Sequence, residues 1–122
     1  MRVYYDDTDA GGIVYHANYL KYCERARSEL FFEAGRTPTA DGAHFVVKHI
    51  DAEFIKSAKL GDMIEVRHKV VNLKFTSMQL YQSIWLDDVK IFEMTSTLVF
   101  AKKGKIVKID DDMREFLISL HL

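Results

Sequence analysis

A helical pattern of eighteen residues, from Ala17 to Ala34, is the feature that most constrains how this chain can fold. Its apolar residues recur at spacings of three and four and share one face: Tyr19, Tyr22, Cys23, Ala26, Leu30 and Ala34. Asn18 is the expected N-cap and Gly35 the expected residue just past the C-terminal end. At ~1.5 Å per residue the helix is roughly 27 Å long. For a chain of 122 residues that is long, so the remaining chain must wrap it.

After this helix the sequence is typical of strands joined by short turns. Strands are expected over 45–55, 64–71, 75–86, 91–102 and 106–109, with a short strand at 2–5 before the helix and a second helix from Asp111 to His121. Asp87-Asp88 and Lys103-Gly104 are the predicted hairpin turns. Because no helices separate the late strands, a doubly wound parallel sheet is excluded. The predicted fold class is α+β, with an antiparallel sheet of five or six strands curled around the long helix.

Composition places the chain among ordinary globular proteins that form one domain, here residues 1–122. Lys and Arg number 17 against 18 Asp and Glu, which gives a net charge of −1 and no general attraction to nucleic acid. The longest apolar run, Leu98 to Ala101, is too short to span a bilayer, and no signal peptide follows Met1. The single cysteine, Cys23, fits a reducing compartment. We therefore expect a cytoplasmic protein without a transmembrane segment.

The loop before the helix carries the residues best suited to chemistry. It contains three aspartates and the pair Gly11-Gly12, and His16 follows at the helix start. Backbone amides at a helix N-terminus favour negative charge, so Asp9 would stand beside amides that also stabilise a developing oxyanion. Asp9 would act as a general base on water or as a nucleophile on a carbonyl carbon. His16 would orient water or shuttle a proton, and Tyr5 would hydrogen-bond either partner.

Other interpretations of this loop stay open at this point. Aspartate and glycine together are also typical of a solvated turn. The spacing Asp7-x-Asp9-x-Gly11 suggests a calcium loop, but its twelfth position would be Asn18 instead of Glu. His44, His49 and His68 lack metal-ligand spacing, so no metal site is predicted. Lysines at the predicted turns are expected to be solvated, and a ligand bearing phosphate is the alternative.

Residues 2–29 resemble the signature of the hotdog-fold acyl-CoA thioesterases, with the run Tyr4-Tyr5-Asp6-Asp7-Thr8-Asp9-Ala10-Gly11-Gly12-Ile13-Val14-Tyr15-His16 at its centre. Within that family they are similar to the 4-hydroxybenzoyl-CoA thioesterase group, and in particular to the YbgC-like subfamily associated with the Tol-Pal system. Residues 52–62 resemble the second conserved block of the family, although Ser57 stands where proline is common.

The resemblance implies a single hotdog thioesterase domain that hydrolyses an acyl-CoA thioester to a free acid and CoA. It assigns catalytic roles to Asp9, His16 and Tyr5. It also implies that Tyr15 and His16 contact the substrate, with a backbone amide near His16 holding the thioester oxygen. No cofactor is implied. A binding protein for acyl-CoA or acyl carriers that has lost turnover is the alternative, and a hotdog dehydratase or hydratase is a third reading.

The expected partners also follow from the resemblance. Hotdog subunits pair their sheets edge to edge, the dimers join into tetramers, and each site lies between two chains. Apolar residues that do not all fit inside one sheet independently favour a homo-oligomer: Val71, Trp85, Val89 and Phe92. An acyl-carrier protein or a partner linked to the Tol-Pal system is a further expectation.

Overall fold

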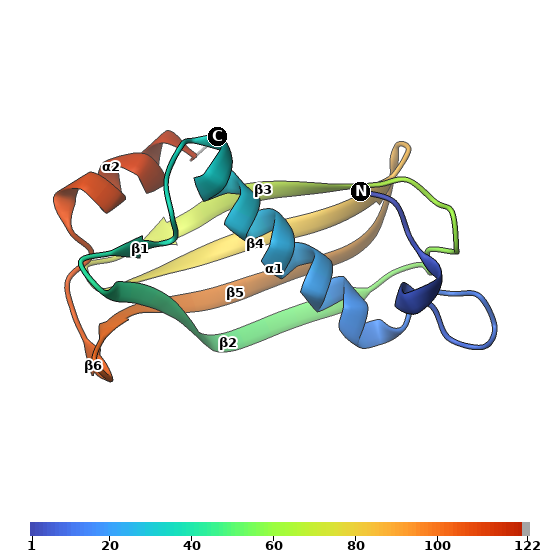
Figure 1. Ribbon diagram of the computed structural model, residues 1–122, viewed down its shortest axis with the longest axis horizontal. Coiled ribbons are helices and arrows are strands. Elements are labelled where there is room, and N and C mark those ends of the chain that lie inside the picture. Colours follow the sequence, from blue (N-terminus) through green and yellow to red (C-terminus); the bar gives the residue numbers. More distant parts are fainter. Residues whose placement is uncertain (121–122) are drawn as a thin grey trace.

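A computed structural model of the chain describes residues 1–120, and it confirms the predicted α+β architecture. The elements, in order, are η1 (Tyr5–Asp7), α1 (His16–Glu33), β1 (Thr39–Ala40), β2 (Ala43–Phe54), β3 (Ile64–Leu73), β4 (Ser77–Leu86), β5 (Val89–Lys102), β6 (Lys105–Ile106) and α2 (Asp111–Ser119). The six strands form one antiparallel sheet in the order β1-β2-β5-β4-β3, with β6 paired to β5. Figure 1 shows α1 lying diagonally across one face of this sheet, the hotdog arrangement. Neither α1 nor α2 has the length and apolarity of a membrane span.

Helix α1 begins one residue earlier than predicted and ends one residue earlier. Its N-cap is Tyr15, which provides no side-chain cap, so the prediction of Asn18 as N-cap is wrong. The prediction for Gly35 is confirmed, because this glycine has φ 72° just past the helix. The amide of Gly35 donates to the Phe32 carbonyl and that of Arg36 to the Phe31 carbonyl, the pair of bonds of a Schellman motif.

The buried face of α1 packs on the sheet in two clusters. Near the helix start, Tyr19, Tyr22 and Cys23 pack in a cluster that includes Phe92. Near the helix end the buried residue is Phe31, whereas Leu30 is half-buried and Ala34 is exposed, so the predicted apolar face is wrong for its last turn. The reason is tertiary: at this end α1 meets α2, and the Phe31 and Phe116 rings lie 5.1 Å apart.

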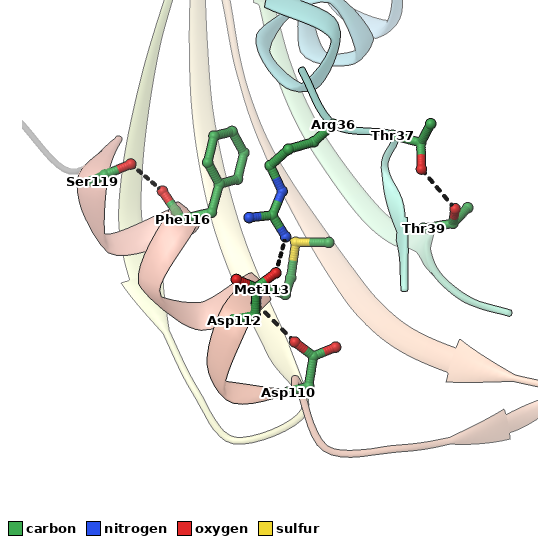
Figure 2. A network of polar contacts seen from close by, with 8 residues as sticks. All are labelled: Arg36, Thr37, Thr39, Asp110, Asp112, Met113, Phe116 and Ser119. Atoms are coloured by element: carbon green, nitrogen blue, oxygen red, sulfur yellow. Dashed lines mark hydrogen bonds and ion pairs between the residues drawn. The ribbon is translucent and has the colours of Figure 1, made fainter. Parts of the chain in front are cut away.

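Helix α2 lies at the end of the sheet near the C-terminal end of α1 (Figure 1), and Figure 2 shows the polar contacts around it. Its N-cap is Asp110, whose carboxylate accepts the amide of Met113 at 2.8 Å, a cap that contributes about 1 kcal/mol. Arg36 forms an ion pair with Asp112 at 2.6 Å, but Asp112 is 81% exposed, so this pair stabilises the docking little. The buried side chains of Met113 and Leu117 are the main attachment. The predicted helix reached His121, which lies outside the described residues.

Two predicted strands differ from the structure. Residues 2–5 form only a single bridge, between Arg2 and Met63, and the chain then enters η1. The strand expected at 106–109 is reduced to β6, since Ile109 turns inward and is fully buried in the core beside α2. Both predicted hairpin turns are confirmed, and Asp87 and Lys103 each have a positive φ there.

Strand β2 is an open edge of the sheet over most of its length. Its pairing with β1 covers only Ala43 and His44. Most of its side chains are exposed, including the apolar ones Val46, Val47, Ile50 and Phe54. The expectation that four apolar residues would not all fit inside is confirmed, since Phe92 is buried, Trp85 is half-buried, and Val71 and Val89 are exposed.

Candidate active site

The loop between η1 and α1 is a compact turn closed by backbone bonds. Thr8 and Val14 form an antiparallel bridge, and inside it the Asp9 amide donates to the Ile13 carbonyl at 2.9 Å. The Gly12 amide donates to the Asp9 carbonyl at 3.0 Å, and Gly12 has φ 81°, a conformation that side chains with a Cβ rarely adopt. Asp9 therefore lies in a loop of defined shape.

The Asp9 carboxylate is exposed and engaged on one side only. Its Oδ1 accepts the Gly11 amide at 2.8 Å, the bond of an Asx turn. A Cβ on Gly11 would lie 3.2 Å from the same oxygen, so glycine leaves room for this bond. The second oxygen, Oδ2, has no hydrogen-bond partner within residues 1–120 and is free to meet water or a ligand.

Helix α1 starts next to this loop with free amides. No acceptor in the described part of the chain takes the N–H of His16 or Ala17, and Tyr15 provides no side-chain cap. The Asp7 carbonyl accepts the Tyr15 amide at 3.1 Å and the Asn18 side-chain amide at 2.8 Å, which fastens the loop to the helix start. Unpaired amides at a helix N-terminus carry partial positive charge and can bind an anion or a carbonyl oxygen.

His16 lies at the same helix start beside an aromatic group. Its ring centroid is 4.9 Å from that of Phe54, the last residue of β2, and the Tyr19 ring lies 5.7 Å from Phe54 in an edge-to-face arrangement. Around them lies a shallow pocket of about 140 Å³, lined by His16, Tyr19, Phe54, Ile55, Lys56 and Ser57. This pocket is a site where part of a substrate could rest against His16.

The predicted tyrosines lie at the surface of this region. Tyr5, in η1, is 80% exposed, and no hydrogen bond among the described residues joins its hydroxyl to Asp9 or His16. Tyr15 is 60% exposed and sits just before the helix. The fold thus brings Asp9, Tyr15 and His16 to one loop and helix start, and it leaves Tyr5 facing solvent.

The segment after β2, at residues 58–60, is hydrogen-bonded to the Asp9 loop. The Val14 amide donates to the Ala58 carbonyl at 2.9 Å, and the Leu60 amide donates to the Gly12 carbonyl at 3.1 Å. The Ala58 amide in turn donates to the Tyr19 hydroxyl at 2.9 Å. The two sequence blocks that carry the family resemblance are therefore in direct contact.

Two buried tyrosines of α1 complete this support. Burial raises the pKa of Tyr19, while the hydrogen bond from the Ala58 amide opposes the shift. Burial, followed by the nearby Asp7 carboxylate, raises the pKa of Tyr22 well above its usual range. The Tyr22 hydroxyl is buried without a hydrogen bond of normal geometry. Both phenols stay protonated at neutral pH and therefore add no charge behind the loop.

Two of the three loop carboxylates, those of Asp7 and Asp9, accept hydrogen bonds from the loop's own backbone. Asp7 Oδ2 accepts the Tyr4 amide at 3.0 Å, and Asp9 Oδ1 accepts the Gly11 amide. Within residues 1–120 there is no group of three histidine, cysteine or acidic side chains placed to hold a metal ion. The loop and helix start together offer an exposed Asp9 carboxylate, an imidazole at His16 and free amides, which are groups that can take part in attack on an activated carbonyl.

Sequence reasoning missed Asn18 and Tyr19 as supports of the site. The sequence predicts Asn18 as the N-cap, yet its side chain bonds to the carbonyl of Asp7, eleven residues earlier. The sequence predicts Tyr19 on the apolar face of the helix, yet its hydroxyl also accepts a hydrogen bond from the Ala58 amide. A helix side chain in the first turn points back toward the N-terminus, and that direction was the available signal for Asn18.

Comparison with known proteins gives a consistent picture. The model of the thioesterase superfamily matches residues 11–93. Acyl-CoA thioesterase YbgC of Helicobacter pylori is 44% identical over 105 residues, which cover 85% of this chain and 79% of that protein. Acyl-CoA thioester hydrolase YbgC of Escherichia coli is 39% identical over 87 residues, covering 69% of this chain and 65% of that protein.

Solved structures agree with the fold. The crystal structure of a hypothetical protein from Aquifex aeolicus superposes with a TM-score of 0.90 at 28% identity, covering 96% of this chain and 95% of that one. A hypothetical protein from Thermus thermophilus also gives a TM-score of 0.90, at 26% identity, covering 99% of this chain and 96% of that one.

Proposed function

Because the chain belongs to the thioesterase superfamily, we propose that it hydrolyses acyl-CoA thioesters to a free carboxylic acid and CoA. The observation that carries this proposal is the exposed Asp9 carboxylate in a loop fastened to the uncapped start of α1. A carboxylate beside unpaired amides matches a reaction in which a carbonyl oxygen gains negative charge. The relatives named YbgC point to the same substrate class.

In the proposed reaction the thioester oxygen rests on the free amides at His16 and Ala17. Asp9 takes a proton from water, and the water oxygen bonds to the carbonyl carbon. The carbon–sulfur bond then breaks, and CoA leaves as a thiolate that takes up the proton held by Asp9, which restores the carboxylate. Direct attack by Asp9 would give an anhydride that water opens, and this is the alternative route. A thioester is reactive enough that these groups suffice, so the mechanism uses no metal or organic cofactor.

His16 and Tyr15 have supporting roles in this proposal. The His16 imidazole, held against Phe54, orients the attacking water or carries its proton away. Tyr15 is exposed beside the helix start, where it would contact the substrate. Tyr5 is the weakest member of the predicted set, because its hydroxyl is exposed and makes no hydrogen bond to Asp9 or His16 within residues 1–120.

The test of the activity is thiol release from a panel of short, long and aromatic acyl-CoA esters, with binding of each ester measured in parallel. We expect turnover of at least one ester without added metal and in the presence of a chelator. Binding of the esters without hydrolysis of any of them would instead identify an acyl-CoA or acyl-carrier binding protein.

We also propose that the open edge of β2 pairs with β2 of a second copy. The opposite edge, β3, is protected, because residue 1 exchanges two backbone hydrogen bonds with Ile64 and the strand carries charges at alternate positions. β1 covers only Ala43 and His44 of β2, and the rest of the strand exposes Val46, Val47 and Ile50. An exposed apolar edge is a template for strand pairing. A pair formed there would bring a second chain close to Phe54 and so to His16.

The remaining expectations rest on the family resemblance. They are the association of dimers into tetramers, a partner that is an acyl carrier or is linked to the Tol-Pal system, and a cytoplasmic location. Each stays a prediction for this chain.

A further inference from the structure

Asn18 occupies an unusual position for a side chain in the first turn of a helix. It is the third residue of α1 and half-buried, yet its amide does not cap the helix. Its Nδ2 donates to the Asp7 carbonyl at 2.8 Å, across eleven residues of chain. The bond therefore joins the helix to the residue at which the Asp9 loop begins.

The same carbonyl accepts a second bond from the helix start, since the Tyr15 amide donates to it at 3.1 Å. The Asp7 carbonyl oxygen thus accepts two donors from the helix start, the backbone amide of Tyr15 and the side-chain amide of Asn18. The other bonds near Asp9 have different partners: those to Ile13 and Gly11 lie within the loop, and those through Val14 and Gly12 lead to the segment after β2. Among the hydrogen bonds of residues 1–120, the pair at the Asp7 carbonyl joins the start of the loop directly to the first residues of the helix.

This distinction matters for the proposed chemistry. Asp9 and the amides of His16 and Ala17 have to act on one carbonyl group together, so their relative placement must hold to a fraction of an ångström. A displacement of ~1 Å in such an arrangement can lower turnover by about 10². We expect loss of the Asn18 bond to leave the bonds within the loop in place and to leave the Tyr15 amide as the one remaining donor to the Asp7 carbonyl, so that the loop shifts more easily relative to the helix.

We propose that Asn18 is a positioning residue for the hydrolysis: its side-chain N–H holds the start of the Asp9 loop in register with the first amides of α1. This inference rests on the proposed function, because it assigns Asn18 an effect exerted through Asp9. The alternative is that Asn18 only stabilises the fold.

The first test compares Asn18→Asp with Asn72→Asp, a matched control. Asn18→Asp keeps the size of the side chain, removes the donor and places an acceptor beside the Asp7 carbonyl. Asn72 is exposed on β3, where its amide makes a 3.5 Å bond to Gln79, so the same chemical change there should leave turnover alone. For Asn18→Asp we expect a 10- to 100-fold lower kcat, as an order of magnitude, with KM almost unchanged. Normal kcat in a folded Asn18→Asp protein would overturn the proposal.

Asn18→Ala removes the donor without adding charge. It replaces Asn18→Asp in the kinetic comparison if Asn18→Asp does not fold. Thermal unfolding is followed for every variant, and kinetics are measured well below each Tm. A purely structural role predicts a lower Tm with normal kcat, and that result would overturn the proposal for either variant.

The second test places Asn18→Ala on an Asp9→Asn background. If Asn18 acts through Asp9, its loss costs little further turnover once Asp9 is gone. A full multiplicative loss in the double variant would contradict action through Asp9. Full turnover in Asp9→Asn alone would instead defeat the proposed function, so the two failures are distinguishable.

Discussion

At the scale of single residues, the site depends on where each polar group finds its partner. Asp9 satisfies one oxygen with the Gly11 amide and leaves the other for chemistry. Asn18 contributes its donor to the loop and leaves the helix amides uncapped. A side-chain cap at the start of α1 would be more stabilising for the helix, typically by ~1 kcal/mol, but it would occupy the amides that the reaction needs.

Cys23 provides a prediction at this scale. It is fully buried against the sheet, and burial raises the pKa of its thiol to about 12, with the charge of Arg27 opposing the shift. Because the thiolate is the reactive form, a disulfide reagent at pH 8 should leave the native protein unlabelled and label one thiol per chain after unfolding. Ser119→Cys, at an exposed position of α2, should label at once. Rapid labelling of the native wild-type protein would show that α1 opens away from the sheet.

At the scale of elements, the sequence predicted the helix and the hairpin turns well, because these depend on residues close together in the chain. The period of the α1 pattern and the glycine at its end placed the helix to within one residue, and the turn residues placed both late hairpins. The strand expected at 2–5 failed because its bridge is limited to Arg2 and Met63, and that pairing depends on a distant segment. Sequence preference alone does not set the length of a strand whose partner lies sixty residues away.

The candidate site was predictable in the same partial way. The sequence identified the loop and the helix start, because aspartates, glycines and a histidine are concentrated there. It did not identify the bond from Asn18 to Asp7 or the support from Ala58, since both depend on how two distant segments meet. The roles given to Tyr5, Asp9, Tyr15 and His16 stay predictions.

At the scale of the whole molecule, the chain presents two unlike sheet edges. The β3 edge is bridged by the first residue and carries alternating charges, whereas the β2 edge is exposed over most of its length and includes the apolar residues Val46, Val47 and Ile50. The proposed site lies at the Phe54 end of that open edge. The β2 edge, proposed to pair with a second copy, is therefore adjacent to the groups proposed for catalysis. We expect dimer formation and hydrolysis to depend on each other.

This coupling gives a prediction for assembly. Ile50, 39% exposed on β2, and Val71, 43% exposed on β3, are matched apolar positions on the two edges. We expect wild type to sediment as a dimer or a larger oligomer, Ile50→Lys to shift toward monomer and lose turnover, and Val71→Lys to behave as wild type. A monomeric wild-type protein with full turnover would contradict pairing through β2, and so would an unchanged Ile50→Lys.

The account depends most on one carboxylate, and Asp9→Asn tests it most directly. Its kcat is measured beside that of Asp6→Asn, an exposed aspartate of η1 three residues earlier, with the acyl-CoA ester that wild type hydrolyses best. We expect Asp9→Asn to lose about 10²-fold or more, within the range for removal of a general base, and Asp6→Asn to keep wild-type turnover. Equal turnover in the two variants would contradict the central claim that Asp9 carries the reaction.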